Sequence, residues 1–533
     1  MPYIADMNAV TSKVASTRDC VESLNCPIAE LTLQRVCLNL SKASYILRCN
    51  GDCLESSTLS KFDSGMASGV ESALWGPLPA DSWIQATLAV ECGGLGLREA
   101  TNVALPAFLA SRTVSRPLVA EMASHCEQAG LCTRDCFMSV FDARTGCALQ
   151  KWRDSLPSSA RGEAEQLLLD AARAAEERWQ RWTDGADTTD LSEETSGIPR
   201  LPVGESIIGN VGDGDIEHPH STPGGSLLLQ RKLTQIVDRH VANGFATKIK
   251  DEARWFDIHR MKDLVAPGAD HTWMWAMHPH KCKPMSDEEF VYAIRMRLGC
   301  GGPEDSCICA NCSKHIITFS GEHCLHCAKG ESTTGHNRVR DELHAMAHSV
   351  DAAAETEPEG LVASYSLLRP ADILTGAFHH GRLAAVDVGI ISPTARGAGD
   401  DSVETMHRRK SERMEIHADD LASANVEYHP FAITCWGRLH PEAAAMLTRL
   451  AKRMARRNGS LAYHNILLRL RAKIPMEIWR RAARMALKCV TTSCDDEAEA
   501  LVEVSPNPLR ALRAGDPAEA ELPLLVPVAS LQR

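Results

Sequence analysis

Apolar residues recur at helical spacing through the first part of the chain. Leu31, Val36 and Leu40 begin the pattern, and the apolar segment 104–111 continues it. Because residues three and four positions apart share one face of a helix, the pattern predicts a helical region over 1–125. A further helical segment is expected over 126–185, in which 150–183 has the pattern of one charged amphipathic helix.

The helical pattern stops after this segment. From Asp184 to Ser226 the composition shifts to Gly, Asp, Thr, Ser and Pro, which predicts a flexible linker over 186–226. Helical spacing returns over 227–299, where Ser286 followed by three acidic residues is typical of a helix start. The end of the chain, 493–533, is rich in Pro, Ala and acidic residues and is predicted to be a disordered tail.

Short apolar runs replace the helical pattern between residues 336 and 440. A helix is expected from 336 to 354, and four strands are expected at Leu361–Leu367, Arg369–Leu374, Leu383–Ile391 and Phe431–Cys435. A helical stretch carrying Arg408, Arg409, Lys410 and Arg413 precedes the last strand. The order of these elements predicts an α/β unit, followed by a basic helical extension over 441–492.

The composition limits the class of protein. The chain has 533 residues, of which 44% are hydrophobic and 24% charged; this length predicts about three or four domains. It has no run of about 18 apolar residues and no signal-peptide pattern, so we expect no membrane association and a nuclear or cytoplasmic location. Twenty cysteines without an export signal favour packing thiols or metal ligands over disulfides.

The net charge of −12 conceals a basic segment. Between Arg438 and Lys488 there are 13 Lys and Arg residues against two acids, Glu442 and Glu477. Such a segment predicts contacts with nucleic-acid phosphates, which position DNA without recognising its sequence. The alternative is an ordinary solvated helical face.

Metal-ligand residue types are dense between Cys300 and His336. Cys309 and Cys312 are spaced so that a tight turn can place two thiolates on one metal ion. The second half of the site is either His323 with Cys327 or Cys324 with Cys327. Both sets suit zinc, and four protein ligands would make the zinc structural. This predicts a small zinc knuckle over 300–335.

Two aspartates interrupt apolar strands downstream of this cluster. Asp387 lies between Val386 and Val388, and Asp372 has a similar place in the preceding strand. Burying a lone carboxylate in a strand is costly unless it is paired or binds a metal, so the two acids predict a shared Mg²⁺ site. The alternative is that both are merely solvated.

A cation would complete this site. Its usual place, two residues after the second acid, is Gly389, so we expect it on the following helix: Lys410, with Arg413 as the second choice. Two histidine-containing pairs nearby, Met406–His407 and His379–His380, are interpreted as exposed polar residues.

The order of these motifs resembles the C-terminal part of non-LTR retrotransposon polyproteins. These motifs are the Cys-x-x-Cys…His-x-x-x-Cys knuckle, His-Asn-x-x-Arg-Asp from His336, Arg-Pro-Ala-Asp ending at Asp372, and Val-Asp-Val around Asp387. Such elements carry a restriction-like endonuclease of the PD-(D/E)XK class, and the resemblance covers about 300–440. It implies Cys309, Cys312, His323 and Cys327 as zinc ligands. It also implies Asp372, Asp387 and Lys410 as the nuclease core, with Glu357 as an accessory acid. A tyrosine that commonly follows the lysine on the same helix is absent.

The first 125 residues resemble the thumb-like region that follows a reverse-transcriptase palm. Segments 40–48, 78–83 and 93–100 carry this likeness, and the palm itself is missing. The resemblance therefore implies a Mg²⁺-dependent DNA endonuclease fragment without polymerase activity, acting on DNA and possibly on element RNA. The alternative is a catalytically degenerate zinc-dependent nucleic-acid-binding protein.

The expected architecture is multidomain α+β. It comprises a helical N-terminal half, a zinc knuckle over 300–335, and a restriction-endonuclease-like α/β core with a central mixed sheet over 336–440. A helical C-terminal extension follows.

Overall fold

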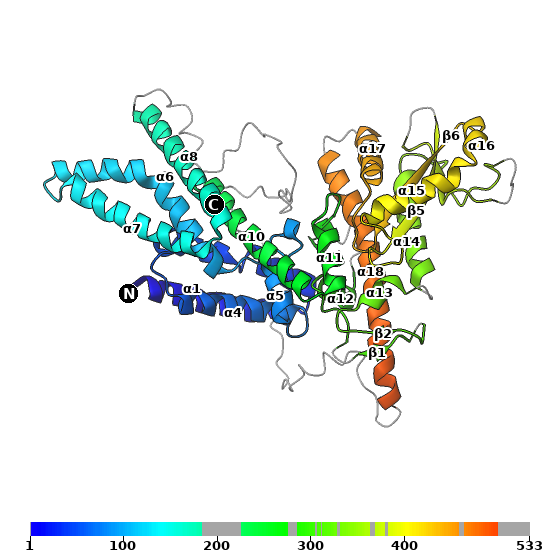
Figure 1. Ribbon diagram of the computed structural model, residues 1–533, viewed down its shortest axis with the longest axis horizontal. Helices are drawn as coiled ribbons and strands as arrows, with labels where there is room; N and C mark the ends of the chain where they lie inside the picture. The colour runs from blue at the N-terminus through cyan, green and yellow to red at the C-terminus, as the bar shows by residue number, and fades with distance from the viewer. Residues whose placement is uncertain are drawn as a thin grey trace, which may run out of the picture.

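The computed structural model is an α+β protein, mostly helical, with two small sheets (Figure 1). It describes residues 2–183, 225–275, 285–303, 306–310, 312–327, 331–362, 368–378, 382–457 and 463–498. The N-terminal helices lie at one end of the molecule and the larger sheet at the other (Figure 1). Within the described residues, none of the helices combines the length and the apolar character that crossing a membrane requires.

The helical region predicted for the first 125 residues is confirmed. Its elements are α1 (Pro2–Glu22), α2 (Pro27–Val36), η1 (Leu40–Lys42), α3 (Ser44–Asn50), α4 (Ser56–Ala73), α5 (Ala80–Thr87), η2 (Val90–Cys92) and the start of α6 (Ala100–Gln128). Helix α4 shows why the pattern folds this way. Leu59, Phe62, Met66 and Val70 recur every three to four residues along it, and all four are buried.

The charged helix expected over 150–183 is two helices. Helix α7 (Arg134–Ser155) ends before Pro157, and α8 (Ser158–Thr183) begins after it. Proline has no N–H to donate and disfavours a helical conformation in the residue before it, here Leu156, whose ψ of 147° is extended. The single-helix prediction was wrong because the proline outweighed the continuous apolar spacing on either side.

The helices from 225 to 297 bridge the two ends of the molecule. They are α10 (Gly225–Asp251), α11 (Trp255–Val265), η3 (Thr272–Trp275) and α12 (Asp287–Arg297). The helix start predicted at Ser286 is confirmed: its side chain accepts a hydrogen bond from the backbone N–H of Glu289, and the Glu289 side chain bonds back. This capping box satisfies two N–H groups that the first turn leaves without partners.

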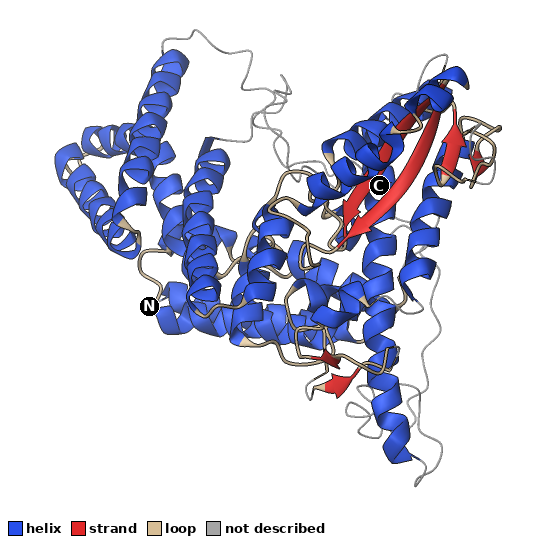
Figure 2. Cartoon of the chain, turned by 45° about the vertical axis from the view of Figure 1, so that its right-hand side comes forward, coloured by secondary structure: helices blue, strands red, loops and turns tan. Residues whose placement is uncertain are grey.

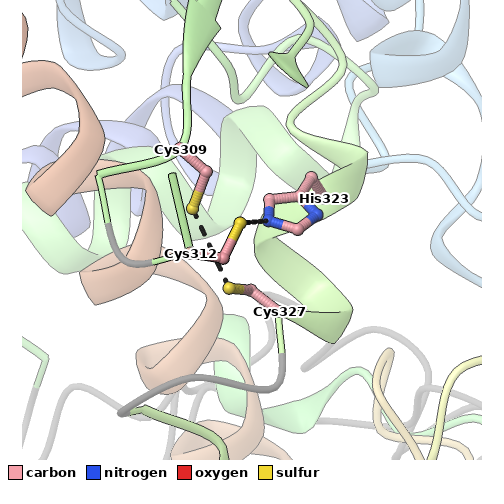
Figure 3. A group of neighbouring side chains, drawn as sticks. All are labelled: Cys309, Cys312, His323 and Cys327. Atoms are coloured by element: carbon pink, nitrogen blue, oxygen red, sulfur yellow. Dashed lines mark hydrogen bonds between the residues drawn. The ribbon is translucent and has the colours of Figure 1, made fainter. Parts of the chain in front are cut away.

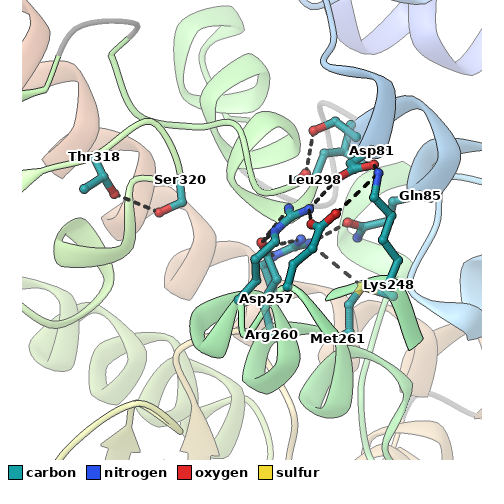
Figure 4. A network of polar contacts seen from close by, with 12 residues as sticks. Asp81, Gln85, Lys248, Asp257, Arg260, Met261, Leu298, Thr318 and Ser320 are labelled. Atoms are coloured by element: carbon teal, nitrogen blue, oxygen red, sulfur yellow. Dashed lines mark hydrogen bonds and ion pairs between the residues drawn. The ribbon is translucent and has the colours of Figure 1, made fainter. Parts of the chain in front are cut away.

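A polar network that runs from the surface to a buried arginine ties α5 to these helices (Figure 4). The Asp81 carboxylate accepts hydrogen bonds from Lys248 at 2.6 Å and from Arg254. The fully buried Arg260 donates to Asp257 and to Gln85, each at 2.7 Å. Because a buried guanidinium is costly unless its donors are satisfied, these bonds fix how α5, α10 and α11 pack together.

The larger sheet has four strands in the order β3 (Glu355–Thr356), β4 (Ile373–Thr375), β5 (Leu383–Ile391) and β6 (Val426–Thr434). Strands β3, β4 and β5 pair antiparallel, whereas β5 and β6 are parallel. The sheet is therefore mixed, and the parallel pair is connected through α15 (Ser402–Glu415) and α16 (Ala418–Ser423).

Helices cover both faces of this sheet (Figure 2). Val386 and Val388 of β5 point into a core built by α14 (Glu331–His348), α17 (Pro441–Arg457) and α18 (Tyr463–Ala498). Ala385, on the alternate face, packs with Met414 of α15 and with α16. Asp387 and Gly389 share this second face because side chains alternate along a strand.

The strand predictions succeed in part. Strand β5 has the predicted bounds, and β6 begins five residues before the predicted strand. Strand β4 covers only Ile373–Thr375, because Pro370 cannot donate a strand hydrogen bond. The strand expected at Leu361–Leu367 lies largely outside the described residues; Leu361 and Val362 are not in a strand.

The largest hydrophobic core crosses the predicted domain boundaries. It joins Leu31 of α2, Ile294 of α12, Cys327 of the knuckle and Trp479 of α18. The domain division itself stays a prediction. The linker expected over 186–226 lies outside the described residues except for the start of α10. The disordered tail was expected from residue 493, but α18 continues to Ala498, and the residues after it lie outside the described part of the chain.

Candidate functional site

The cysteine and histidine cluster is held by a short hairpin and a short helix. Strands β1 (Cys307–Ile308) and β2 (Ile316–Ile317) pair antiparallel, and the turn between them is closed by the Cys309 N–H, which donates to His315 O at 2.8 Å. Helix α13 (Glu322–His326) follows. His323 and Cys327 are four residues apart at this helix and its end, so their side chains point to the same side.

Four side chains converge on one point: Cys309, Cys312, His323 and Cys327 (Figure 3). All four are buried, and their donor atoms lie within 4.8 Å of one another. Cys309 Sγ is 3.8 Å from Cys327 Sγ, and Cys312 Sγ is 3.3 Å from His323 Nε2. Zinc–sulfur bonds of about 2.3 Å in a tetrahedron separate two sulfurs by about 3.8 Å, so the donors fit a zinc ion.

This is the ligand set that the family resemblance implies. The second set left open by the residues, with Cys324 in place of His323, is not the one whose donor atoms converge. A buried Cys₃His cluster can hold zinc, and its four protein ligands leave no open position for chemistry. Its role is accordingly structural.

The surroundings of Cys312 favour its thiolate. Burial acts to raise the pKa of this thiol, but a hydrogen bond with His315 and the backbone N–H groups of Lys314 and His315 together lower the pKa to about 5. Since the thiolate is the form that binds a metal, this ligand is ready for zinc at neutral pH.

The knuckle is docked on the long helix α18. The Arg481 guanidinium of α18 donates to Leu325 O of α13 at 3.1 Å, and both residues are buried. The zinc-ligand cysteines belong to the same hydrophobic core as Trp479 of α18. The cluster therefore supports the packing of α18 as well as its own loop.

The two predicted aspartates come from neighbouring segments of the sheet. Ile373 of β4 pairs with Val386 of β5 at the end of their antiparallel register; Asp372 immediately precedes β4, and Asp387 follows Val386 in β5. Both carboxylates lie near the same two side chains: Lys410 bonds Asp387 and its charge lowers the pKa of Asp372, and the charges of both acids act to raise the pKa of Tyr428. Asp372 N donates to Val386 O at 2.9 Å, one residue out of step with the β4–β5 register, and the Asp372 carboxylate accepts a hydrogen bond from Val388 N at 2.7 Å.

Lys410 reaches the second acid from helix α15. Its Nζ donates to Asp387 Oδ1 at 2.6 Å, and both side chains are largely buried. The lysine crosses directly over Gly389: a Cβ placed on that glycine would lie 2.5 Å from Lys410 Cε. The Lys410 side chain thus fills the space of the missing side chain, two residues after Asp387, where the sequence motif would have a lysine. The charge of the predicted second choice, Arg413, opposes the rise in the pKa of Tyr428 that burial and Asp387 cause.

Asp372 is paired with a histidine. His336, on α14, has its Nε2 3.4 Å from Asp372 Oδ2 and 3.1 Å from Val388 O, and Val388 N donates to the same carboxylate oxygen at 2.7 Å. Burial acts to raise the pKa of Asp372, but these hydrogen bonds and the charges of His336 and Lys410 outweigh it and lower the pKa. The hydrogen bond to Asp372 raises the pKa of His336. The other oxygen, Oδ1 of Asp372, makes no hydrogen bond within the described residues.

The sequence analysis missed Tyr428. The hydroxyl of this β6 residue donates a hydrogen bond to Asp387 Oδ2 at 2.5 Å. The pKa of Tyr428 is raised, mainly by burial and next by the negative charge of Asp387. The predicted strand began at Phe431, after Tyr428, so the residue was not considered. The parallel register pairs Tyr428 with Ala385, beside Asp387, and a correct strand start would have indicated its position.

Glu357 lies next to this site, but its carboxylate is paired. Its backbone N donates to Asp372 O at 2.8 Å, while its carboxylate accepts hydrogen bonds from Arg340 and Arg369. The carboxylate predicted to be the accessory acid is thus paired with two guanidinium groups. Its role in catalysis stays a prediction.

Much of the basic segment 438–488 bonds within the chain. Arg480 and Arg484 form ion pairs with Glu289 of α12, and Arg438 pairs with Asp401 and Asp263. Four cations of α17 are exposed. Arg449, Lys452 and Arg456 recur every three or four residues along one side of the helix, whereas Arg457 lies off this side and donates to Ser349 O. Phosphate contacts are therefore expected from this side of α17 rather than from the whole segment.

No protein-family model matches the chain, and no curated protein matches it either. The function is therefore argued from the geometry of the acidic site and the Cys₃His cluster.

Proposed function

We propose that the chain is a metal-dependent DNA endonuclease whose reacting centre is built by Asp372, Asp387 and Lys410. One observation carries the proposal. Asp387 of β5 and Asp372, just before β4, both lie near one lysine from the next helix, and this lysine occupies the position at which a motif lysine would stand. Carboxylate oxygens suit Mg²⁺, and an ammonium beside them suits a phosphate that gains charge during hydrolysis.

The surrounding elements support this proposal. The expected restriction-like core has a central mixed sheet, and the sheet here is mixed, with the acids in and next to its central strands. Helix α14 precedes the three antiparallel strands and contributes His336, which pairs with Asp372. Helix α15 connects the parallel pair and contributes Lys410, which pairs with Asp387. The side chains come from four separate segments of the chain, which is expected of a functional site more than of a local turn.

Each residue has a distinct task in this proposal. Asp372 and Asp387 would hold Mg²⁺, which lowers the pKa of bound water and stabilises charge on the phosphate. Lys410 would neutralise charge on the phosphate oxygen as the water attacks. Tyr428 fixes the orientation of the Asp387 carboxylate through its hydrogen bond and acts as a positioning residue.

The test is nicking of supercoiled plasmid DNA by the full chain with Mg²⁺. Asp387→Asn preserves the side-chain shape and removes the charge, so we expect at least a 100-fold loss of nicking with an unchanged fold. A matched control is Asp351→Asn: this acid bonds Thr375 and Gly376 at the far end of β4. Nicking by Asp387→Asn at the wild-type rate would overturn the proposal.

The second candidate is a zinc-dependent nucleic-acid-binding protein without catalysis. The buried Cys₃His cluster and the exposed cations of α17 favour it. It predicts equal DNA binding by the wild type and Asp387→Asn, steeply weakened by salt, and no cleavage by either. Binding that is lost in a variant with Arg449, Lys452 and Arg456 changed to Gln would locate the DNA interface.

A further inference from the structure

A second group of metal-ligand side chains lies where α15 meets the start of α17. Glu404 and His407 are three residues apart on α15, so both project from one side of the helix. His440 immediately precedes α17 and faces them. One donor atom from each of the three residues lies within 4.8 Å of the other two. None of them belongs to the Cys₃His cluster or touches the Asp372–Asp387 pair through a hydrogen bond within the described residues.

The two imidazole rings are held in parallel. Their centroids are 3.9 Å apart and their planes differ by 13°. The His440 side chain is 6% exposed and that of His407 is 14% exposed, although the sequence pattern predicted His407 as an exposed polar residue. The burial of both rings fixes their nitrogen atoms, as expected for metal ligands on packed elements.

Two carboxylates lie at the solvent side of these rings. His440 Nε2 is 2.9 Å from Glu404 Oε2, and His407 Nε2 is 2.8 Å from Glu442 Oε2. Both glutamates are more than half exposed, so each can change its rotamer at little cost. The site thus combines imidazole nitrogens held in place by burial with carboxylate oxygens that can move at the solvent side, from which an ion would enter.

The arrangement offers a cation two imidazoles and a carboxylate in one place. Without a cation, each neutral ring can donate its Nε2–H to the glutamate opposite it, and bonds to such exposed carboxylates return little energy. A divalent ion instead binds the lone pairs of two neutral imidazoles and the charge of a carboxylate. Imidazole nitrogen and carboxylate oxygen together are ligands typical of zinc.

We propose that Glu404, His407 and His440 form a second metal site that binds zinc, with water or Glu442 as the fourth ligand. Zinc–nitrogen and zinc–oxygen bonds of about 2.0–2.1 Å place tetrahedral donors about 3.3 Å apart. The present donors lie within 4.8 Å of one another, and the 2.9 Å distance between His440 Nε2 and Glu404 Oε2 would open slightly. Binding through Nε2 of His440 places its proton on Nδ1. The 3.3 Å contact from the Glu442 backbone N–H to that nitrogen then lengthens.

A metal ion at this site would hold the first turns of α15 in place. Asp401 caps the same end of the helix, accepting a hydrogen bond from Glu404 N, and is also paired with Arg438 at 2.7 Å. A metal ion between α15 and His440 would fasten this end of the helix to the loop after β6. Lys410 lies one turn further along α15, so the ion would limit movement of that lysine. The metal site itself does not depend on the proposed nuclease activity.

The test is the number of zinc ions bound per full chain, measured by native mass spectrometry after equilibration with zinc. We expect two ions in the wild type and one in His407→Ala, and at least a tenfold weaker second site in Glu404→Gln, which changes only an exposed side chain. Cys327→Ser should remove the other ion. The matched control is His348→Ala, since His348 stacks on His344 at 5.7 Å without belonging to any ligand group in the described residues.

Cobalt substitution separates the two sites by their chemistry. Only the Cys₃His site contains sulfur, so only it gives thiolate-to-metal charge-transfer absorption, which His407→Ala should leave unchanged while removing one cobalt. A single zinc in the wild type, lost in Cys327→Ser and kept in His407→Ala and Glu404→Gln, would overturn the proposal. This result would leave the nuclease proposal standing, because nicking and metal count are measured separately.

Discussion

Replacing Gly389 with alanine tests whether the location of Lys410 matters. The added Cβ would lie 2.5 Å from Lys410 Cε and 2.9 Å from Met406 Cγ, whereas carbon atoms pack at about 3.5–4.0 Å. The lysine must therefore move by about 1 Å. Its 2.6 Å bond to Asp387 does not survive a displacement of that size.

The expected effect on activity is large and the effect on stability small. Misplacing a reacting group by about 1 Å can cost 100-fold in rate, so we expect about a 100-fold slower Mg²⁺-dependent nicking. The atoms in the way belong to flexible side chains, and Gly→Ala at an ordinary backbone conformation restricts the unfolded chain, worth about 0.4–1 kcal/mol. The melting temperature should change by a few degrees at most.

A matched substitution and a second measurement make this test independent of activity. At Gly376 in the same sheet region an added Cβ meets nothing closer than 3.6 Å, so Gly376→Ala should behave as the wild type. Amine labelling followed by mass spectrometry reports Lys410 directly: it should be protected in the wild type and Gly376→Ala, and reactive in Gly389→Ala. If Gly389→Ala keeps both the protection and the nicking rate, the reasoning is refuted.

Three further predictions follow from the same structure. Lys410→Ala should lose about 100-fold in nicking, and adding Gly389→Lys should restore part of it, because the new lysine enters the space that Lys410 left; no recovery would contradict the assigned geometry. Cys327→Ser should lower the melting temperature of the main unfolding transition, because the zinc ligands share the largest core, whereas Cys136→Ser on the surface of α7 should not. Burial raises the pKa of Asp63 to about 6 from 3.8, so the stability from its protonated form is full below pH 3.8 and lost as the pH rises through 6. In thermal melts from pH 4 to 8, the free energy of unfolding of Asp63→Asn should therefore rise relative to that of the wild type by up to about 3 kcal/mol.

Patterns in the sequence correctly predicted the bounds of β5 and the start of α12. The apolar run of β5 gave its bounds, and Ser286 gave the start of α12, because both depend on residues within the element. Strand β6 was predicted too short because its first half, which includes Glu427 and Pro430, is polar or lacks an N–H. That half is nevertheless a strand because its parallel partner β5 provides the pairing, and no pattern within β6 records this.

Local patterns also could not predict which cations of the basic segment 438–488 pair inside the protein and which face solvent. A count of arginines does not distinguish a cation that faces solvent from one that pairs inside the protein. Arg480 is buried against Glu289, a residue 191 positions earlier in the chain, so only the folded arrangement of α12 and α18 decides its role. His407 was misjudged for the same reason, since its stacking partner His440 comes from another element.

Helix α15 explains why the expected acid–lysine spacing is absent from β5. A lysine on the strand would be positioned by the strand itself, but Lys410 is positioned by the packing of α15 on the sheet. That packing needs a small residue beneath the lysine, which Gly389 supplies, and a buried anchor, which Met414 supplies at the end of the helix. Because the lysine's location depends on the register of α15, substitutions that loosen this helix should reduce activity even where they touch neither acid. In the proposed nuclease the functional unit is accordingly the α15–β5 pair, and a motif confined to the strand does not describe it.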